Sequence, residues 1–303
     1  MSLKRGAVLG LALLGVLGLP AGRLAAQEAA AGKLKVFISA DMEGVGGVST
    51  WSVQAGSKGR EYEKFRELMT KEVNAAIAGA FDAGASEVLV GDSHGDAQNI
   101  DVEILDKRVK LIRAWPRPLG MMQGVDATFD AAVFVGYHAA EGREKATLSH
   151  SFNGSLEVAL DGVWVPEAGF NAAIAGDFGV PVVFLSGDQT ICADAKKLLG
   201  PIETAAVKEA GGFYSATMMH PDEAQRLIRE GVRRGVERRR EIKPYRIARP
   251  VKLEIRCNDV VFAELVAMLP GVERPKGNVI VFQGRDMVEV SKFFEAISNI
   301  KVP

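Results

Sequence analysis

Residues Lys35 to Gly47 read KVFISADMEGVGG, an apolar run typical of a buried strand that leads into a glycine-rich turn. Asp41 and Glu43 lie two positions apart where this run ends. In an extended backbone both side chains leave the same face, while Met42 points the other way, into the core. Two carboxylates on one face repel each other, so we expect a positive partner there: a divalent metal, a basic side chain or a shared proton.

Two further strands are expected to end in polar residues. An amphipathic helix predicted over residues 60–83 leads to a strand over residues 87–91, which runs into His94. A third apolar run, 131–136, leads into His138. Parallel strands present their carboxyl ends at one edge of a sheet, so we expect these histidines to meet the carboxylates of the first strand.

The whole pattern predicts an α/β fold, with a mainly parallel sheet flanked by helices, an inserted β-hairpin and a small C-terminal β-α-β-α appendage. The hairpin is expected over residues 156–165, because an Asp-Gly pair separates its two strands. The other expected elements are a strand at 109–112, a helix from Glu167 to Ala175, a strand at 181–188, a short helix to Leu199, a candidate strand at 204–208, a helix at 221–242, strands at 251–256 and 278–283, and helices at 260–269 and 287–300.

The start of the chain has the layout of a secretory signal. Lys4 and Arg5 precede an apolar run from Gly6 to Leu19, and cleavage is expected near Ala26. A membrane anchor is the alternative, but the run is shorter than the roughly 20 residues that span a bilayer. We therefore expect a periplasmic or secreted protein without stable membrane insertion after cleavage. The expected divisions are a signal peptide at 1–26, a disordered leader at 27–33, an α/β metal-binding catalytic domain at 34–245 and a small α/β domain at 246–303.

Composition excludes some classes of partner. Loss of Lys4, Arg5 and Arg23 with the signal takes the 37 basic residues to 34, against 38 acidic residues. The arginine-rich helix at 221–242 also carries interspersed glutamates, which indicates a solvated, ion-paired face, so no nucleic-acid partner is expected. Cys192 and Cys257 are compatible with one bridge or two buried thiols, and buried thiols are favoured.

Three of the four histidines, His94, His138 and His150, lie in short polar motifs. His, Asp and Glu without a suitably placed Cys form the ligand set of a hydrolytic zinc site. Each histidine alone is more often a hydrogen-bonded structural residue, but their joint occurrence in such motifs favours metal ligation. His220 precedes a proline at a predicted helix start and is interpreted as structural.

Two other enzyme classes fit poorly. The glycines from Gly44 to Gly47 lack the full dinucleotide fingerprint, and a pyrophosphate would meet the carboxylates of Asp41 and Glu43. The segment Gly91-Asp92-Ser93-His94-Gly95 has the Gly-x-Ser-x-Gly spacing of a serine-hydrolase elbow, but Ser93 and His94 are adjacent only in sequence, so a serine hydrolase is the weaker interpretation.

Five motifs, taken in order, resemble the M55 family of zinc D-aminopeptidases, the dipeptide-transport-operon type. The resemblance runs from about Leu34 to near the C-terminus and is carried by Ser39-Ala40-Asp41-Met42-Glu43-Gly44, Asp92-Ser93-His94, Gly136-Tyr137-His138-Ala139, Ser149-His150-Ser151 and Glu167-x-Gly-x-Asn171.

The resemblance implies two zinc ions per chain, held by Asp41, which bridges both, by Glu43 on one of them, and by His94, His138 and Glu167. It also implies that His150 is the catalytic residue near the metals. This chain departs from the family's Gly-Glu-x-Gly-x-Asn segment, because Pro166 precedes the glutamate.

The chemistry of these residues agrees with the resemblance. Two zinc ions about 3.5–4 Å apart can polarise a carbonyl, activate water and offset the charge of three carboxylates. A nearby histidine can move a proton to the leaving amine or stabilise an oxyanion, and the sequence leaves both roles open for His150. Asp92 is either a partner that orients His94 or a turn-capping residue.

We therefore expect an exported binuclear zinc aminopeptidase that releases N-terminal residues from short peptides. The resemblance alone implies D-amino acids at the N-terminus and a homo-oligomer, as a ring that encloses the active sites. The alternatives are a periplasmic peptide- or metal-binding protein without turnover, and a metal-dependent amidase on non-peptide substrates.

Overall fold

The computed structural model describes residues 33–152 and 156–300. The expected signal peptide, and the expected leader up to residue 32, lie outside the described residues. From Leu34 onward the chain forms one compact unit. Within the part that is described, no helix combines the length and the apolar character needed to cross a bilayer.

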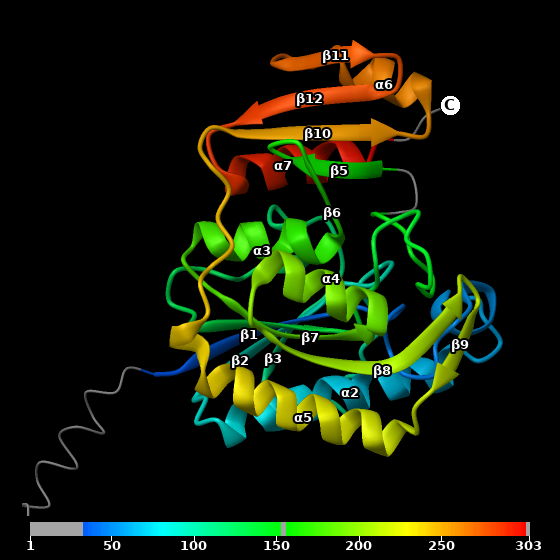
Figure 1. Cartoon of the computed structure of the whole chain (residues 1–303), viewed down its shortest axis with the longest axis vertical. Helices are drawn as coiled ribbons and strands as arrows, with labels where there is room; N and C mark the ends of the chain where they lie inside the picture. Colours follow the sequence, from blue (N-terminus) through cyan, green and yellow to red (C-terminus); the bar gives the residue numbers. More distant parts are fainter. Residues whose placement is uncertain (1–32, 153–155, 301–303) are drawn as a thin grey trace, which may run out of the picture. The chain divides into compact units, whose positions relative to one another are not determined.

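A seven-stranded sheet forms the centre of this unit (Figure 1). Neighbouring strands are parallel, except that the last strand runs antiparallel to the one before it. The α/β fold expected from the sequence is confirmed. In spatial order the strands are β3 (Lys110–Ile112), β2 (Glu87–Asp92), β1 (Lys35–Ala40), β4 (Ala131–Val135), β7 (Val182–Asp188), β8 (Glu203–Gly212) and β9 (Ser215–Met218).

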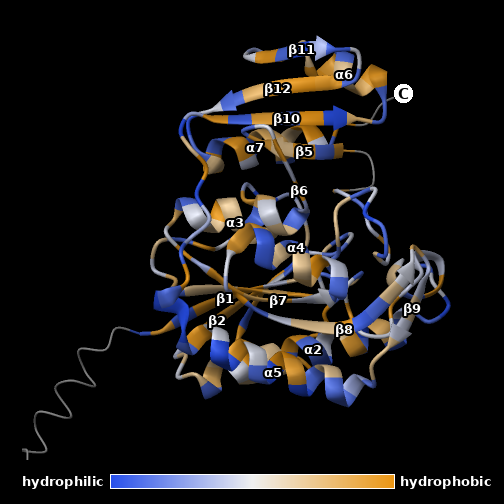
Figure 2. Cartoon of the chain, viewed as in Figure 1, coloured by the Kyte–Doolittle hydropathy of each residue, from blue (hydrophilic) through white to orange (hydrophobic). Residues whose placement is uncertain are grey.

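Helices cover both faces of this sheet. Figure 1 shows α2 (Tyr62–Asp82) and α5 (Pro221–Glu237) side by side on one face, with α3 (Glu167–Asp177) and α4 (Gln189–Leu199) on the other. The central strands are therefore apolar along their length (Figure 2), and every residue of β4 is buried. The outer face of α5 carries Arg–Glu pairs, as expected for a solvated, ion-paired helix, and the chain then makes a short 3-10 helix, η3 (Arg239–Glu241).

A second, five-stranded sheet corrects two expectations. The hairpin is no isolated insertion, because its first strand pairs antiparallel with a strand of the C-terminal segment. That segment also contains one strand more than the expected β-α-β-α pattern. The spatial order is β11 (Val272–Lys276), β12 (Val279–Gly284), β10 (Val251–Cys257), β5 (Leu156–Leu160) and β6 (Val163–Val165), with helices α6 (Val260–Val266) and α7 (Met287–Ser298).

The alternation of β10 explains the second sheet, since buried and outward residues alternate along it and one face packs on α7. Helix α7 also packs against α3 of the large sheet. The boundary between residues 245 and 246 stays a prediction from the sequence, while the second sheet takes strands from both sides of it. Cys192 and Cys257 are buried and unbridged, as favoured above.

Two glycines allow the turns that follow β1 and β4 to pack in close contact. The amide of Gly44 donates to the carbonyl of Gly136 at 2.7 Å. A Cβ on Gly44 would lie 2.0 Å from the carbonyl oxygen of Tyr137, and a Cβ on Gly136, where φ is +72°, would lie 2.2 Å from that of Asp41. Only glycine fits at these positions, and this close contact holds the turn after β1 against the turn after β4.

The substitution Gly44→Ala is expected to lower the free energy of unfolding by about 3 kcal/mol, because the added methyl meets backbone that cannot move aside. Gly277→Ala, where a Cβ meets nothing within 4 Å, is the matched control and should change it by less than about 0.5 kcal/mol. Urea unfolding checks both variants. Equal free energies of unfolding for the two variants would contradict the close contact between the turns after β1 and β4.

Candidate metal centre

Polar side chains gather where the connections of the large sheet diverge. From β1 the chain order runs outward through β2 and β3 on one side, and through β4, β7 and β8 on the other. A crevice opens at the carboxyl ends of strands at such a switch point. Asp41 and Glu43 follow β1, His94 follows β2 and His138 follows β4, and all four are buried. The convergence expected from the sequence is present.

One group of candidate ligands consists of Asp41, Glu43 and His94. The Nδ1 atom of His94 lies 2.8 Å from Glu43 Oε2 and 3.3 Å from Asp41 Oδ1. The three side chains come from two adjacent parallel strands whose ends are in register. This arrangement can hold one cation among two carboxylates and an imidazole.

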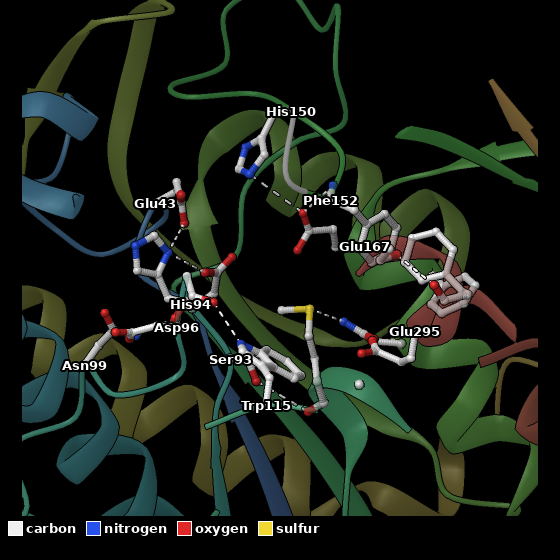
Figure 3. Close-up of a pocket in the computed structure, with 18 of the residues that line it drawn as sticks. Glu43, Ser93, His94, Asp96, Asn99, Trp115, His150, Phe152, Glu167 and Glu295 are labelled. Carbon is white, nitrogen blue, oxygen red and sulfur yellow. Dashed lines mark hydrogen bonds and ion pairs between the residues drawn. The ribbon is translucent and has the colours of Figure 1, made fainter. Parts of the chain in front are cut away.

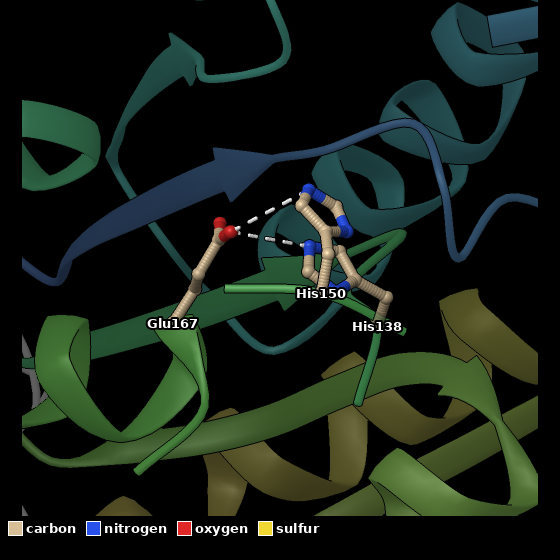
Figure 4. A group of neighbouring side chains, drawn as sticks. All are labelled: His138, His150 and Glu167. Carbon is tan, nitrogen blue, oxygen red and sulfur yellow. Dashed lines mark ion pairs between the residues drawn. The ribbon is translucent and has the colours of Figure 1, made fainter. Parts of the chain in front are cut away.

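A second group consists of His138, His150 and Glu167. Figure 4 shows both imidazoles directed at the carboxylate of Glu167. Glu167 Oε1 lies 3.4 Å from His138 Nε2 and 3.8 Å from His150 Nε2. The two rings stack, with centroids 3.9 Å apart. Glu167 is the first residue of α3, and Pro166 occupies the N-cap position.

Asp41 joins the two groups. Its Oδ1 faces His94, and its Oδ2 lies 3.4 Å from Nε2 of His138. Asp41 Oδ2 and Glu43 Oε2 are nevertheless buried without a hydrogen bond. Buried carboxylate oxygens without a donor are unfavourable unless a cation binds them. The donor set therefore fits two cations that share Asp41.

Backbone carbonyls orient all three imidazoles. Nε2 of His94 lies 2.8 Å from the carbonyl of Ala55, while Nδ1 of His138 and Nδ1 of His150 lie 3.0 and 2.8 Å from the carbonyls of Ala139 and Leu148. A carbonyl only accepts, so each of these nitrogens carries the hydrogen. In the neutral imidazoles the other nitrogen presents its lone pair to the carboxylates, which is the orientation of a metal ligand.

Without a metal, protons provide the positive charge. Burial disfavours the charged form of His138, but the carboxylate of Glu167, with help from Asp41 and Glu43, raises its pKa to about 10. The pKa of His94 is raised as well, since Glu43 and Asp41 outweigh its burial. A proton and a metal ion thus compete for the same nitrogens.

Two further contacts hold the carboxylates. Trp51 Nε1 donates to Glu43 Oε1 at 2.7 Å, and the amide of Phe152 donates to Glu167 Oε1 at 2.8 Å. Trp51 begins a single π-helical turn, η1 (Trp51–Ala55), which ends at the carbonyl that orients His94. This one turn therefore positions two candidate ligands.

Two buried ionisable side chains hold the turn after β1 through hydrogen bonds to its backbone. Lys208 Nζ donates to the carbonyls of Glu43, Val45 and Val48. Glu72 Oε1 accepts from the amide of Gly46 at 2.8 Å. Sequence reasoning missed Trp51, Lys208 and Glu72, although a lysine directly after the apolar run Ala205–Val207 was a usable signal.

The structure also decides two interpretations. Asp92 does not contact the ring of His94; its carboxylate accepts from the side chain of Asn99 and the amide of Ile100, so it fixes the loop after β2. His220 is exposed and caps α5, where its ring accepts from the amide of Asp222, as expected for a structural residue.

A cavity of about 720 Å³ opens onto both candidate groups (Figure 3). Trp51, His94 and His150 line one end of it, and residues of α7 line the other. Met121, Phe170 and Ile174 form an apolar wall of the cavity. The cavity is large enough for a dipeptide-sized ligand next to the candidate metal ligands.

Comparison with known proteins identifies the family. The model of the M55 peptidase family, described as D-aminopeptidase, matches residues 34–296. The chain belongs to this family. A D-aminopeptidase of Bacillus subtilis (strain 168) is 36% identical over 259 residues, which cover 84% of this chain and 93% of that protein. The M55 resemblance noted in the sequence is confirmed.

A solved structure agrees with this assignment. The Zn-dependent D-aminopeptidase DppA from Bacillus subtilis, described as a self-compartmentalizing protease, matches with a TM-score of 0.84 at 32% identity, over 88% of this chain and 97% of that one. Membership of the family makes the chain a metallo-aminopeptidase, so the alternative of a binding protein without turnover is set aside.

The titration of Glu72 generates a stability prediction. Burial raises the pKa of Glu72 to about 7, against the opposing effects of the Gly46 amide and of Lys208. Its protonated form is thus favoured by folding, and that stabilisation is present below pH 4.5 and is lost as the pH rises through 7. Between pH 5 and 8, Glu72→Gln should therefore gain on the order of 2 kcal/mol relative to the parent chain.

Chemical unfolding at the two pH values measures this difference. Glu63→Gln, an exposed position on the same helix, is the control and should follow the parent chain. Identical pH dependence for Glu72→Gln and the parent would refute the assignment of a buried, protonated Glu72.

Proposed function

We propose that the chain is a zinc-dependent D-aminopeptidase that uses two metal ions to release N-terminal residues from short peptides. The observation that carries the proposal is the position of Asp41, whose two oxygens face two separate groups of candidate ligands. Family membership and the Zn-dependent relative support the choice of metal and substrate. The proposed ligands are Asp41 for both ions, Glu43 and His94 for one, and His138 and Glu167 for the other.

Zinc in this site would supply Lewis-acid polarisation of the scissile carbonyl and a nucleophile from water at neutral pH. The chain's own residues would orient the ligands and neutralise the charge of the metal ions. The three carboxylates offset the metal charge, and Trp51 and the amide of Phe152 keep two of them in place. The apolar wall excludes water from the far side of the substrate.

His150 is proposed as the catalytic residue and not as a ligand. Among the histidine–carboxylate contacts of the two groups, the one from its Nε2 to Glu167 is the longest, at 3.8 Å, and its side chain is 15% exposed against 1% for His138. The carbonyl of Leu148 fixes the hydrogen on Nδ1, so Nε2 is free to take a proton and pass it to the leaving amine. Trp51 packs edge-on against the ring and restricts its motion.

Location and assembly are part of the proposal. Residues 4–26 have the pattern of a secretory signal, which supports action outside the cytoplasm. The relative described as self-compartmentalizing supports a homo-oligomer, in the form of a ring. Exposed apolar side chains on α6 and the turn after it, Val260, Val261, Met268 and Leu269, offer contact area. Cell fractionation and light scattering test these two points.

Metal content tests the two-ion site. Elemental analysis of the purified protein should find close to two zinc ions per chain. Asp41→Asn should lose most of both, because the shared carboxylate is replaced by a neutral amide of the same size. Asp194→Asn, a surface acid paired with Arg143, is the control and should keep the metal. A well-folded parent chain that stays free of zinc after addition of zinc would sink the proposal.

Kinetics of a His150 variant test the mechanism. His150→Asn should lower kcat by about 10²–10⁴-fold on D-alanyl amides, since proton transfer is lost, while zinc content stays at the parent value. The parent enzyme should cleave D-alanyl amides faster than L-alanyl amides and should not cleave N-acetylated ones. Loss of zinc in the variant would make His150 a ligand, and cleavage of acetylated substrates would favour an amidase.

A further inference from the structure

The cavity extends beyond the candidate metal ligands to a carboxylate that the proposed mechanism does not use. Helix α7 contributes Phe294, Glu295, Ser298 and Asn299 to its lining. Figure 3 shows Glu295 across the pocket from Glu43 and His94. Glu295 comes from the C-terminal segment, and its side chain belongs to the same cavity as the ligands of the large sheet.

The carboxylate of Glu295 is without a partner in the described part of the chain: among residues 33–152 and 156–300, no side chain or backbone group makes a hydrogen bond or ion pair with it. Oε1 lies over the backbone of Gly120, where a Cβ would come within 2.5 Å of it. Partial burial raises its pKa to about 7, and Arg117 opposes this rise. An acid in such surroundings is stabilised by a cation that enters the cavity.

Arg117 does not serve as that cation. Its guanidinium donates to the carbonyls of Ala114, Asp92 and Ile112, at 2.6, 2.9 and 3.4 Å. Its guanidinium is therefore held by backbone carbonyls and forms no hydrogen bond with Glu295. The positive charge of Arg117 lowers the pKa of Glu295 without a hydrogen bond, so both carboxylate oxygens can accept hydrogen bonds from a ligand.

The position of Glu295 decides which group of a substrate it meets. In a peptide the α-ammonium is two bonds from the scissile carbonyl carbon, so it must lie beside the metal ligands. Glu295 lies across the cavity from Glu43 and His94 (Figure 3), away from the place of the α-ammonium. A group bound at Glu295 therefore reaches it along a side chain.

The wall of the cavity fits the stem of such a side chain. Met121, Phe170, Ile174 and Phe294 line it, and each is less than 10% exposed. A lysine-type side chain places methylene groups on an apolar surface and its ammonium at a polar end. These apolar side chains suit the stem of the first residue's side chain.

We propose that Glu295 is a specificity-determining residue that binds the ammonium group of a long basic side chain on the N-terminal residue of the substrate. The inference rests on the proposed function, because it takes the scissile bond to lie at Asp41, Glu43 and Glu167. The substrate class is then short peptides that begin with a lysine- or ornithine-like residue of the D configuration proposed above.

The test compares two substrates that differ in the ammonium group. D-lysine p-nitroanilide and D-norleucine p-nitroanilide share the four-carbon stem. The zinc-loaded parent enzyme should prefer the lysine substrate by about tenfold or more in kcat/KM, the effect of one charge-assisted hydrogen bond. In Glu295→Gln this ratio should fall close to one. Glu289→Gln, on the same helix and paired with Arg285, should keep the parent ratio.

Two results would overturn the proposal: a parent ratio near one, or a ratio that Glu295→Gln leaves unchanged. Circular dichroism confirms that the isosteric variant is folded. If the parent cleaves neither substrate, the peptidase function fails, and calorimetric binding of free D-lysine and D-norleucine then decides on the subsite. Tighter binding of D-lysine that is lost in Glu295→Gln would uphold the subsite, and equal affinities would refute it.

Discussion

The repulsion among three buried carboxylates governs the construction of this protein. Asp41, Glu43 and Glu167 lie within one cluster from which water is largely excluded, and isolated buried charges of one sign are strongly unfavourable. The surrounding chain supplies three imidazoles whose hydrogens are directed away from the acids, onto backbone carbonyls. In the neutral imidazoles the lone pairs therefore face the acids, and the positive charge comes either from bound protons or from metal ions.

The fold meets a second demand of the same cluster, which is precision. Strands β1, β2 and β4 bring three turns with candidate ligands to one edge of the sheet. The contact between Gly44 and Gly136 sets the separation of the turns after β1 and β4. Lys208 then holds the turn after β1 by three carbonyls at once. The bivalent role of Asp41 depends on this rigidity, since a carboxylate that rotates freely could not face two groups.

Much of this site could be predicted from the sequence because its ligands follow strands. Asp41, Glu43, His94 and His138 each come directly after an apolar run, and the parallel arrangement of those runs implies that they meet. Glu167 and His150 lie in a helix start and a loop, where no periodicity fixes their direction, so the M55 resemblance was needed for Glu167 as a ligand and for the catalytic role of His150. Trp51 and Lys208 were missed, because their contacts join residues that no local pattern relates. The pairing of β5 with β10 was missed for the same reason: the two strands are about ninety residues apart, and each alternates well enough to pair elsewhere.

The pairing of β5 with β10 and the packing of α7 on α3 set an order of assembly. The proposed metal ligands are all present by the time residue 167 has been synthesised, but the part of the cavity with Phe294 and Glu295 comes from the last described helix. A chain that ends before α7 has every proposed ligand but lacks the part of the cavity lining that α7 contributes. In the proposed enzyme, the metal site and the substrate subsite would therefore be completed at different points of synthesis, the subsite last.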